Sequence, residues 1–273
     1  MGQKEATDAP LQIASVNKAL MALQRLGEVG SDGRALNRLA ADLGLHKSSL
    51  HHTLSAMRLR GFVEQDNCGN YRLGAVALSL AESYLHNDSF AALHEPLNRL
   101  SLEINEICHL GILMEEDVIY VHKAFPRKCI NTWSSVGFRN PALTTALGRA
   151  IACQKYLDFE SFALSFPTPI PQRTPHTQVS LKDIWMELVG ARRRGHARET
   201  DEYEVGTSCL AVAILRGHQP MAAISITGPT DRVGERQELF LMRSLRTYIA
   251  PHLPAGLTLQ VTTEKGASRA ILS

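Results

Sequence analysis

One stretch of the sequence combines basic side chains with a complete lack of acidic ones. No Asp or Glu occurs between Leu43 and Val63, and this stretch carries Lys47, Arg58, Arg60, His46, His51 and His52. Cations gathered on one face could bind an anionic polymer such as nucleic acid. A solvated helix face would account for the same residues, so their interpretation depends on the element that carries them.

A second group of reactive side chains lies in the C-terminal half. Cys209 could act as a nucleophile with Glu199 or His196 as its base, which would indicate an enzyme acting on a small acid. The sequence contains no GxSxG, HExxH, GxxxxGK or GxGxxG motif. Acidic residues in this region could suggest a metal, but we interpret them as a solvated loop: Glu199, Asp201, Glu202 and Glu204.

The composition describes a globular chain with a local excess of positive charge. The 273 residues are 44% hydrophobic, which excludes disordered, collagen-like and nucleic-acid-coating tail proteins. The length favours two domains or one large one. Of 29 Lys and Arg and 27 Asp and Glu, residues 1–74 hold nine and seven, so the remainder has 20 of each. The whole excess therefore lies in the first quarter.

The cysteines argue against an extracellular scaffold or a metal-bound one. They are odd in number, widely spaced and without a CxxC pair: Cys68, Cys108, Cys129, Cys153 and Cys209. We expect reduced thiols, no metal and no cofactor. Neither a signal peptide nor an apolar run of about 20 residues is present. The sequence therefore predicts a cytoplasmic protein.

The elements that carry the basic stretch form a recognisable order. Ser15 can cap a first helix with an apolar stripe through Leu26, and a second stripe from Leu36 to Leu43 has Asn37 as a possible cap. Gly44 supplies a turn, and a third helix opens at Leu45 and ends at Gly61. Its expected core face is Leu50, Leu54 and Met57, and its polar face is Lys47, Ser48, His51, His52 and Ser55.

The third helix is followed by two short strand patterns. Residues 62–65 and 71–73 flank a run of turn-forming residues, so they predict a hairpin. Three helices and a hairpin make a winged helix-turn-helix, whose third helix can enter a major groove about 12 Å wide. The third helix would therefore place the basic residues of this stretch against DNA.

The rest of the chain mixes helices and strands. Residues 74–86 predict a linker helix, and helices are expected at 90–107, 145–157, 181–194 and 232–250. Strands are expected at 108–114, 118–125, 209–215 and 221–227. Four prolines between residues 167 and 175 indicate a loop excursion. This order predicts an α+β fold with a mainly antiparallel sheet.

Several blocks together resemble the IclR family of bacterial transcription regulators. The first is Leu45 to Leu54 with the following Gly61-Phe62-Val63 and Tyr71-Arg72-Leu73-Gly74. The second is Pro141 with residues 145–150, and the third runs from Gly195-His196-Ala197 through Glu199, Asp201, Glu202 and Gly206 to Cys209. The last is residues 223–229. The blocks cover about residues 12–260 in the family's order.

The resemblance implies a regulator with two functional parts. It gives a disordered N-terminus at 1–11, a winged helix-turn-helix at 12–74, a linker helix at 75–88, a GAF-like effector-binding domain at 89–262 and a tail at 263–273. Such proteins form homodimers or dimers of dimers on palindromic operators, commonly as repressors. Their effector is a small metabolite, often an organic acid, and no membrane is involved.

The resemblance also assigns residues to the DNA-binding surface. They are Lys47, Ser48, Ser49 and His52 on the third helix, to which we add the adjacent His51 and, in the wing, Asn70. The family usually has arginine where His52 stands, and histidine cannot make the bidentate guanine contact of a guanidinium. A turn-forming role alone would explain Asn70 equally well.

On the effector side the resemblance indicates Ala146, Leu147, Glu199, Cys209, Ser225 and Thr227. Amides at a helix N-terminus are anion receptors, and residues two apart on a strand face the same side. Cys209 could equally be a small buried thiol. Glu199 stands where the family usually has aspartate, Leu143 where it often has histidine, and Arg149 where it has lysine. Glu199 is therefore expected to bind a ligand hydroxyl rather than a carboxylate.

Three functions remain to be compared. A metabolite-responsive regulator predicts an enclosed polar pocket near Ser225, whereas a DNA-binding protein with a purely dimerising second domain predicts a solid one. The enzyme using Cys209 is the third and least supported, because its motifs are missing.

Overall fold

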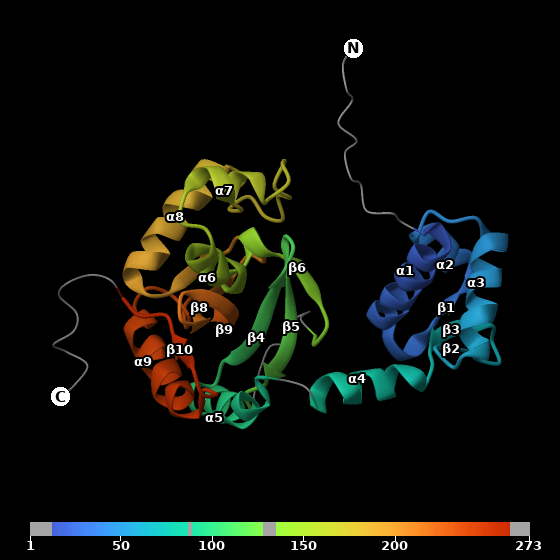
Figure 1. Ribbon diagram of the computed structural model, residues 1–273, viewed down its shortest axis with the longest axis horizontal. Coiled ribbons are helices and arrows are strands. Elements are labelled where there is room, and N and C mark those ends of the chain that lie inside the picture. The colour runs from blue at the N-terminus through green and yellow to red at the C-terminus, as the bar shows by residue number, and fades with distance from the viewer. Residues whose placement is uncertain (1–12, 87–88, 128–134, 263–273) are drawn as a thin grey trace, which may run out of the picture. The chain divides into compact units, whose positions relative to one another are not determined.

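The computed structural model describes residues 13–86, 89–127 and 135–262. The chain divides into two compact units between residues 88 and 89 (Figure 1). The N-terminus expected to be disordered, the C-terminal tail and Cys129 lie outside the described residues. No helix in the described ranges is long and apolar enough to cross a membrane.

The N-terminal unit is a winged helix-turn-helix, as expected. Its helices are α1 (Ala14–Val29), α2 (Leu36–Asp42) and α3 (Lys47–Leu59). The wing consists of β2 (Val63–Gln65) and β3 (Asn70–Leu73), paired antiparallel. A strand that the sequence did not reveal, β1 (Arg34–Ala35), pairs with β3 and completes the sheet order β1-β3-β2. Helix α4 (Val76–His86) follows the wing.

A small core holds the three helices and the wing together. Leu26, Leu39, Leu50 and Leu54 are at most 1% exposed, and Tyr71 of β3 packs in the same cluster. Burial of each such leucine stabilises the fold by about 1.5–3 kcal/mol. The third helix therefore has one face fixed in the core, which leaves its opposite face available.

The expected helix starts of this unit were each wrong by two residues. Ile13 is the N-cap of α1 and Ala35 that of α2, so Ser15 and Asn37 lie inside their helices; neither Ile13 nor Ala35 makes a side-chain capping bond. Helix α3 begins at Lys47 rather than Leu45. Packing of the apolar stripes sets these ends, because hydroxyl and amide caps contribute only about 1 kcal/mol.

The C-terminal unit contains a seven-stranded antiparallel sheet with the order β10-β8-β9-β4-β5-β6, and β7 also pairs with β8. The long strands are β4 (Ile107–Met114), β5 (Asp117–Ala124), β8 (Thr207–Arg216) and β9 (Gln219–Pro229). The short ones are β6 (Arg139–Pro141), β7 (Ala197–Thr200) and β10 (Leu257–Leu259). All pairs are antiparallel. The predicted α+β fold is confirmed.

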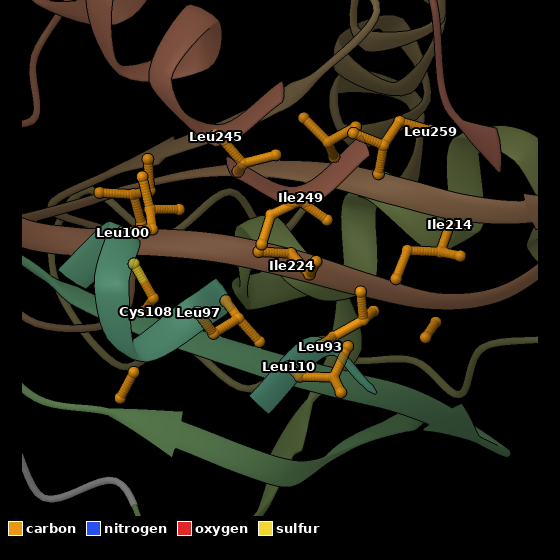
Figure 2. Packing of buried hydrophobic residues seen from close by; sticks show 14 of the residues in the cluster. Leu93, Leu97, Leu100, Cys108, Leu110, Ile214, Ile224, Leu245, Ile249 and Leu259 are labelled. Atoms are coloured by element: carbon orange, nitrogen blue, oxygen red, sulfur yellow. The ribbon is translucent and has the colours of Figure 1, made fainter. Parts of the chain in front are cut away.

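Helices cover both faces of this sheet (Figure 1). On one face α5 (His94–Ile104) and α9 (Glu238–Ile249) enclose a core of large aliphatic side chains; Leu97, Leu110, Ile224 and Ile249 belong to it (Figure 2). On the other lie α6 (Ala146–Lys155), α7 (Phe159–Leu164) and α8 (Leu181–Arg194).

The sequence placed most of these elements but not all of their ends. Residues 90–107 were expected as one helix, yet Asn105 adopts a left-handed conformation that ends α5, and Ile107 opens β4. Helix α9 begins at Glu238 rather than residue 232. The short strands β6, β7 and β10 of this sheet were missed because three or four residues do not establish an alternating pattern.

Candidate DNA-reading helix and ligand cavity

The exposed face of α3 carries most of the residues expected to meet DNA. Lys47, Ser48, His51 and His52 are exposed, while Leu50 and its neighbours on the buried face are not. The rings of His51 and His52 lie edge to face with centroids 5.9 Å apart. Short polar side chains and imidazoles at the N-terminal end of a helix can reach both phosphates and base edges.

Ser49 differs from its neighbours because it is only half exposed. Its hydroxyl accepts a hydrogen bond of 3.1 Å from Nζ of Lys18 on α1. Lys18 thus brings a further cation to the edge of α3. The sequence did not single it out, because it lies on a different helix 31 positions away.

The wing is organised by a network around one carboxylate. Asp66 accepts bonds from the amides of Cys68 and Asn70 at 2.9 and 2.8 Å and from the Asn70 side chain at 3.2 Å. Both backbone bonds hold the pKa of Asp66 below its usual range. Asn70 therefore has a turn-forming role in the structure, and its contact with DNA stays a prediction.

The six residues expected to bind an effector all line one cavity. Its volume is about 210 Å³, and Ala146, Leu147, Glu199, Cys209, Ser225 and Thr227 belong to its walls. They come from helix α6 and strands β7, β8 and β9. The structure thus brings together positions that are as much as 81 residues apart in the sequence.

Strand register explains how the sheet contributes to this cavity. Cys209 lies opposite Glu199 on β7 and opposite Thr227 on β9, and Ser225 lies opposite His109 on β4. Directly opposed residues of antiparallel strands project to the same face. On β8 and β9 this face carries small side chains such as Ala211, Ala213 and Ala223, whereas the opposite face of these strands carries Ile, Leu and Val, so space remains beneath α6.

Helix α6 begins at the wall of the cavity. Thr145 is its N-cap and accepts a 3.1 Å bond from the amide of Gly148. The amides of Ala146 and Leu147 occupy the first turn, where no intrahelical acceptor exists. A Cβ at Gly148 would lie 2.2 Å from the carbonyl oxygen of Ala142, so only glycine permits this close packing. The first turn of α6 is thus a potential anion receptor.

The cavity is also lined by seven residues that were not predicted from the sequence to bind an effector: His109, Tyr120, Thr145, Arg173, Tyr203, Glu204 and Thr207. The guanidinium of Arg173 lies 4.0 Å from the centroid of the Tyr203 ring, and His109 stacks on Tyr120 at 4.7 Å. Strand pairing could have indicated His109 and Tyr120. Arg173 has no such signal, because it lies in the proline-rich loop excursion.

Burial keeps most polar groups of the cavity uncharged. Desolvation first, and then the nearby Lys123 and His122, lower the pKa of His109 to about 3, so its imidazole is neutral. Burial raises the pKa of the Tyr120 phenol and raises that of the Cys209 thiol well above its ordinary value. Cys209 is therefore a thiol, which is a poor nucleophile.

Glu199 is the buried acid of the cavity. Only 2% of it is exposed, and one carboxyl oxygen accepts bonds from the amides of Glu202 and Tyr203 at 2.6 and 3.0 Å. Its other oxygen, Oε2, is buried and has no hydrogen-bond partner in the described part of the chain. Burial raises the pKa of Glu199 to about 7, although both amide bonds act in the opposite direction.

The interpretation of the acidic region as a solvated loop was wrong for two of its four residues. Glu199 and Glu202 are only 2% and 5% exposed. Glu202 pairs with the buried Arg149, which also donates a 2.8 Å bond to the carbonyl oxygen of Leu143. The sequence missed this because the partners are 53 positions apart. Among the described residues, no group of three or more His, Cys, Asp or Glu side chains could hold a metal ion.

Comparison with known proteins supplies the family. Residues 15–67 match the IclR helix-turn-helix domain, and residues 82–249 match the bacterial transcriptional regulator IclR C-terminal domain. The glycerol operon regulatory protein of Streptomyces coelicolor is 30% identical over 83% of this chain and 89% of that protein. The transcriptional repressor IclR of Escherichia coli is 29% identical, covering 81% and 82%.

A solved structure agrees in fold. An IclR homologue from Microbacterium hydrocarbonoxydans, complexed with 4-hydroxybenzoate, has a TM-score of 0.69 and 20% identity, covering 86% of this chain and 98% of that one. The curated relatives are transcription regulators rather than enzymes. With the winged helix-turn-helix and both family domains present, the chain belongs to the IclR family of DNA-binding transcription regulators.

Proposed function

We propose that this regulator is a repressor whose operator binding is controlled by a small organic acid in the cavity beneath α6. The observation that carries this is the convergence of hydroxyls, a thiol and the start of a helix on one cavity of about 210 Å³. That volume suits a small ligand, and helix amides attract an anion.

The DNA-reading part of the proposal rests on α3. Phosphates and base edges are contacted by five residues of this helix: Lys47, Ser48, Ser49, His51 and His52. Asn70 holds the wing against the sugar-phosphate backbone of the DNA. Exposure of the four α3 residues other than Ser49 supports this assignment. Lys18 adds charge through its contact with Ser49. Phosphate contacts supply affinity, while base contacts supply sequence choice.

The proposal includes a homodimer, alone or as a dimer of dimers, on a palindromic operator. Apolar side chains remain exposed along α1: its N-cap Ile13 is 65% exposed, and Val16 and Leu20, which follow at helical spacing, are 52% and 53% exposed. Leu78 and Tyr84 of α4 are 74% and 55% exposed. Apolar surface of this kind marks protein contacts. Two reading helices then act together on two half-sites.

Repression and an acid effector are supported by the relatives. The Escherichia coli relative is a repressor, and a homologue of the same fold holds the aromatic acid 4-hydroxybenzoate. The GAF-like description of the second domain belongs to the same proposal. A bacterial regulator of this kind acts on chromosomal DNA, so a cytoplasmic location goes with it.

The test combines calorimetry with operator release. Pyruvate, gluconate and 4-hydroxybenzoate would be titrated into the full-length protein, and the acid that binds would be added to an operator gel shift. We expect one acid to bind and to release DNA, and Ser225→Ala to weaken its binding by about tenfold, because one charge-assisted hydrogen bond is lost.

The matched control for Ser225→Ala is Ser79→Ala, at an exposed position on α4. Equal binding of the acid by the two variants would remove the cavity assignment.

Two other functions make different predictions. If no acid binds, the second domain serves dimerisation alone, although a polar cavity near Ser225 does not favour that. An enzyme using Cys209 would require a thiolate, and the raised pKa of this thiol opposes it.

A further inference from the structure

The carboxyl of Glu199 is buried, and among the described residues it forms no ion pair. Arg149, whose charge acts to lower the pKa of Glu199, binds other groups: its two terminal nitrogens each lie 2.6 Å from an oxygen of Glu202, and Nε donates to the carbonyl oxygen of Leu143. One oxygen of Glu199 is occupied by two backbone amides, and Oε2 has no hydrogen-bond partner among the described residues. A charge in such a position is costly, so the neutral acid is favoured.

Little positive charge lies around Glu199 in the cavity beneath α6, and the basic residues of the more open groove that Glu199 also lines, Arg198, His176 and Arg236, are themselves partly or fully exposed to water. Facing it or sharing its cavity are Cys209 of β8, Tyr120 of β5, His109 of β4, Tyr203 and Glu204 of the following turn, and Arg173 of the proline-rich loop. The thiol and the phenol keep their protons and the imidazole is neutral. Arg173 is exposed and stacks on Tyr203. Charge on Glu199 would therefore be only weakly compensated on the side that faces the cavity.

An anionic ligand makes this charge still less favourable. A carboxylate held at the first turn of α6 would occupy the same cavity of about 210 Å³ as Glu199. Two like charges at such short range disfavour each other, so one must be neutralised. The carboxylate of the ligand binds a proton more weakly than the carboxylate of Glu199 does, and the proton therefore goes to Glu199.

We propose that the cavity takes up one proton, held by Glu199, when it binds an organic acid, so that release of the operator is coupled to pH. The inference rests on the proposed function of the same cavity. The proton comes from solvent, and no bond other than that between the proton and a carboxyl oxygen forms. Glu199 also lines a second, more open groove of about 800 Å³, which gives solvent another approach to this residue.

Calorimetry in two buffers with different ionisation enthalpies measures the proton directly. Pyruvate, gluconate and 4-hydroxybenzoate would be titrated at about pH 6 and about pH 8. With a Glu199 pKa of about 7 in the free protein, uptake should be about 0.1 proton at the lower pH and about 0.9 at the higher. The dissociation constant of the acid should rise about tenfold from about pH 6 to about pH 8.

Two variants isolate the group that takes up the proton. Glu199→Gln keeps an oxygen for the two backbone amides and is permanently neutral, so proton uptake should disappear and the dissociation constant should no longer change with pH. Glu103→Gln removes an exposed carboxyl from α5 that does not line the cavity and should retain the uptake. A carbon-13 titration of the free protein should contain one glutamate signal with a midpoint near 7 that is missing from Glu199→Gln.

The outcomes separate this inference from the proposed function. Binding without proton uptake at about pH 8, or uptake that persists in Glu199→Gln, would overturn the inference and leave the acid site in place. If none of the three acids binds at about pH 6, where Glu199 carries its proton, the acid site is wrong and the inference with it.

Discussion

Arg149 and Glu202 form a buried, bidentate ion pair in which both nitrogen–oxygen distances are 2.6 Å. The guanidinium side chain is 1% exposed and the carboxylate side chain 7%. Glu202 also accepts a 2.9 Å bond from the amide of Gln178, and its carbonyl oxygen accepts one of 2.6 Å from Thr177. The pair thus ties α6 to the turn after β7 and to the proline-rich loop, whose residues line the cavity.

Removing one partner of this pair should destabilise the C-terminal unit strongly. Glu202→Gln leaves Arg149 as an uncompensated buried charge, and we expect the free energy of unfolding to fall by about 3–5 kcal/mol in urea denaturation. The exposed pair of Arg99 and Glu95 is the control, because its side chains are 67% and 68% exposed. Glu95→Gln should cost less than about 1 kcal/mol. Equal effects of the two substitutions would contradict the structural role of Glu202.

The stability of the protein should depend on the proton of Glu199. Its folded pKa of about 7 lies above the unfolded value of about 4.3, so its contribution to stability is complete below about pH 4.3 and is lost as pH rises through about 7. The difference in unfolding free energy between wild type and Glu199→Gln should therefore fall by about 2–4 kcal/mol across that window. Denaturation of both proteins at about pH 4.5, 6 and 8 measures it, and a constant difference would show that Glu199 titrates normally.

Lys47 should contribute to affinity for DNA without contributing to the fold. Because it is exposed on α3, Lys47→Ala should leave the unfolding free energy unchanged while weakening operator binding. Loss of one phosphate contact should reduce the slope of log affinity against log salt by about 0.9 per reading helix. Arg99→Ala removes the same charge from α5 and should leave the slope unchanged. A gel-shift midpoint at fixed salt that is the same for Lys47→Ala and wild type would refute the contact.

The apolar face of α1 should hold two copies of the chain together. Leu20→Asp places a charge on a side chain that is 53% exposed in one copy, and we expect light scattering to give a smaller molecular mass than for wild type. Operator affinity should fall at the same time, because two linked readers are needed. Leu164→Asp, on an 83% exposed residue of α7, should retain at least a dimer. If the Leu20→Asp protein also remains at least a dimer, another surface forms the dimer.

Much of the fold could be predicted because its signals are local. The face of α3 follows from the spacing of Leu50, Leu54 and Met57, all three of them buried, and residues 181–194 form the expected helix. Strand positions Ser225 and Thr227 share a face for the same reason, since the period of two is fixed by the backbone. Helix starts were less predictable, because caps are weak compared with packing.

The sequence by itself therefore determined the family, the order of the elements and the residue types available for DNA and ligand. Only the tertiary structure decided which ionisable side chains are buried away from water. Arg149 and Glu202 pair across 53 positions, Glu199 is buried with one oxygen that has no hydrogen-bond partner among the described residues, and Arg173 reaches the cavity from a loop. Burial and pairing depend on neighbours that are distant in the chain, and the protonation state of a carboxyl depends on both.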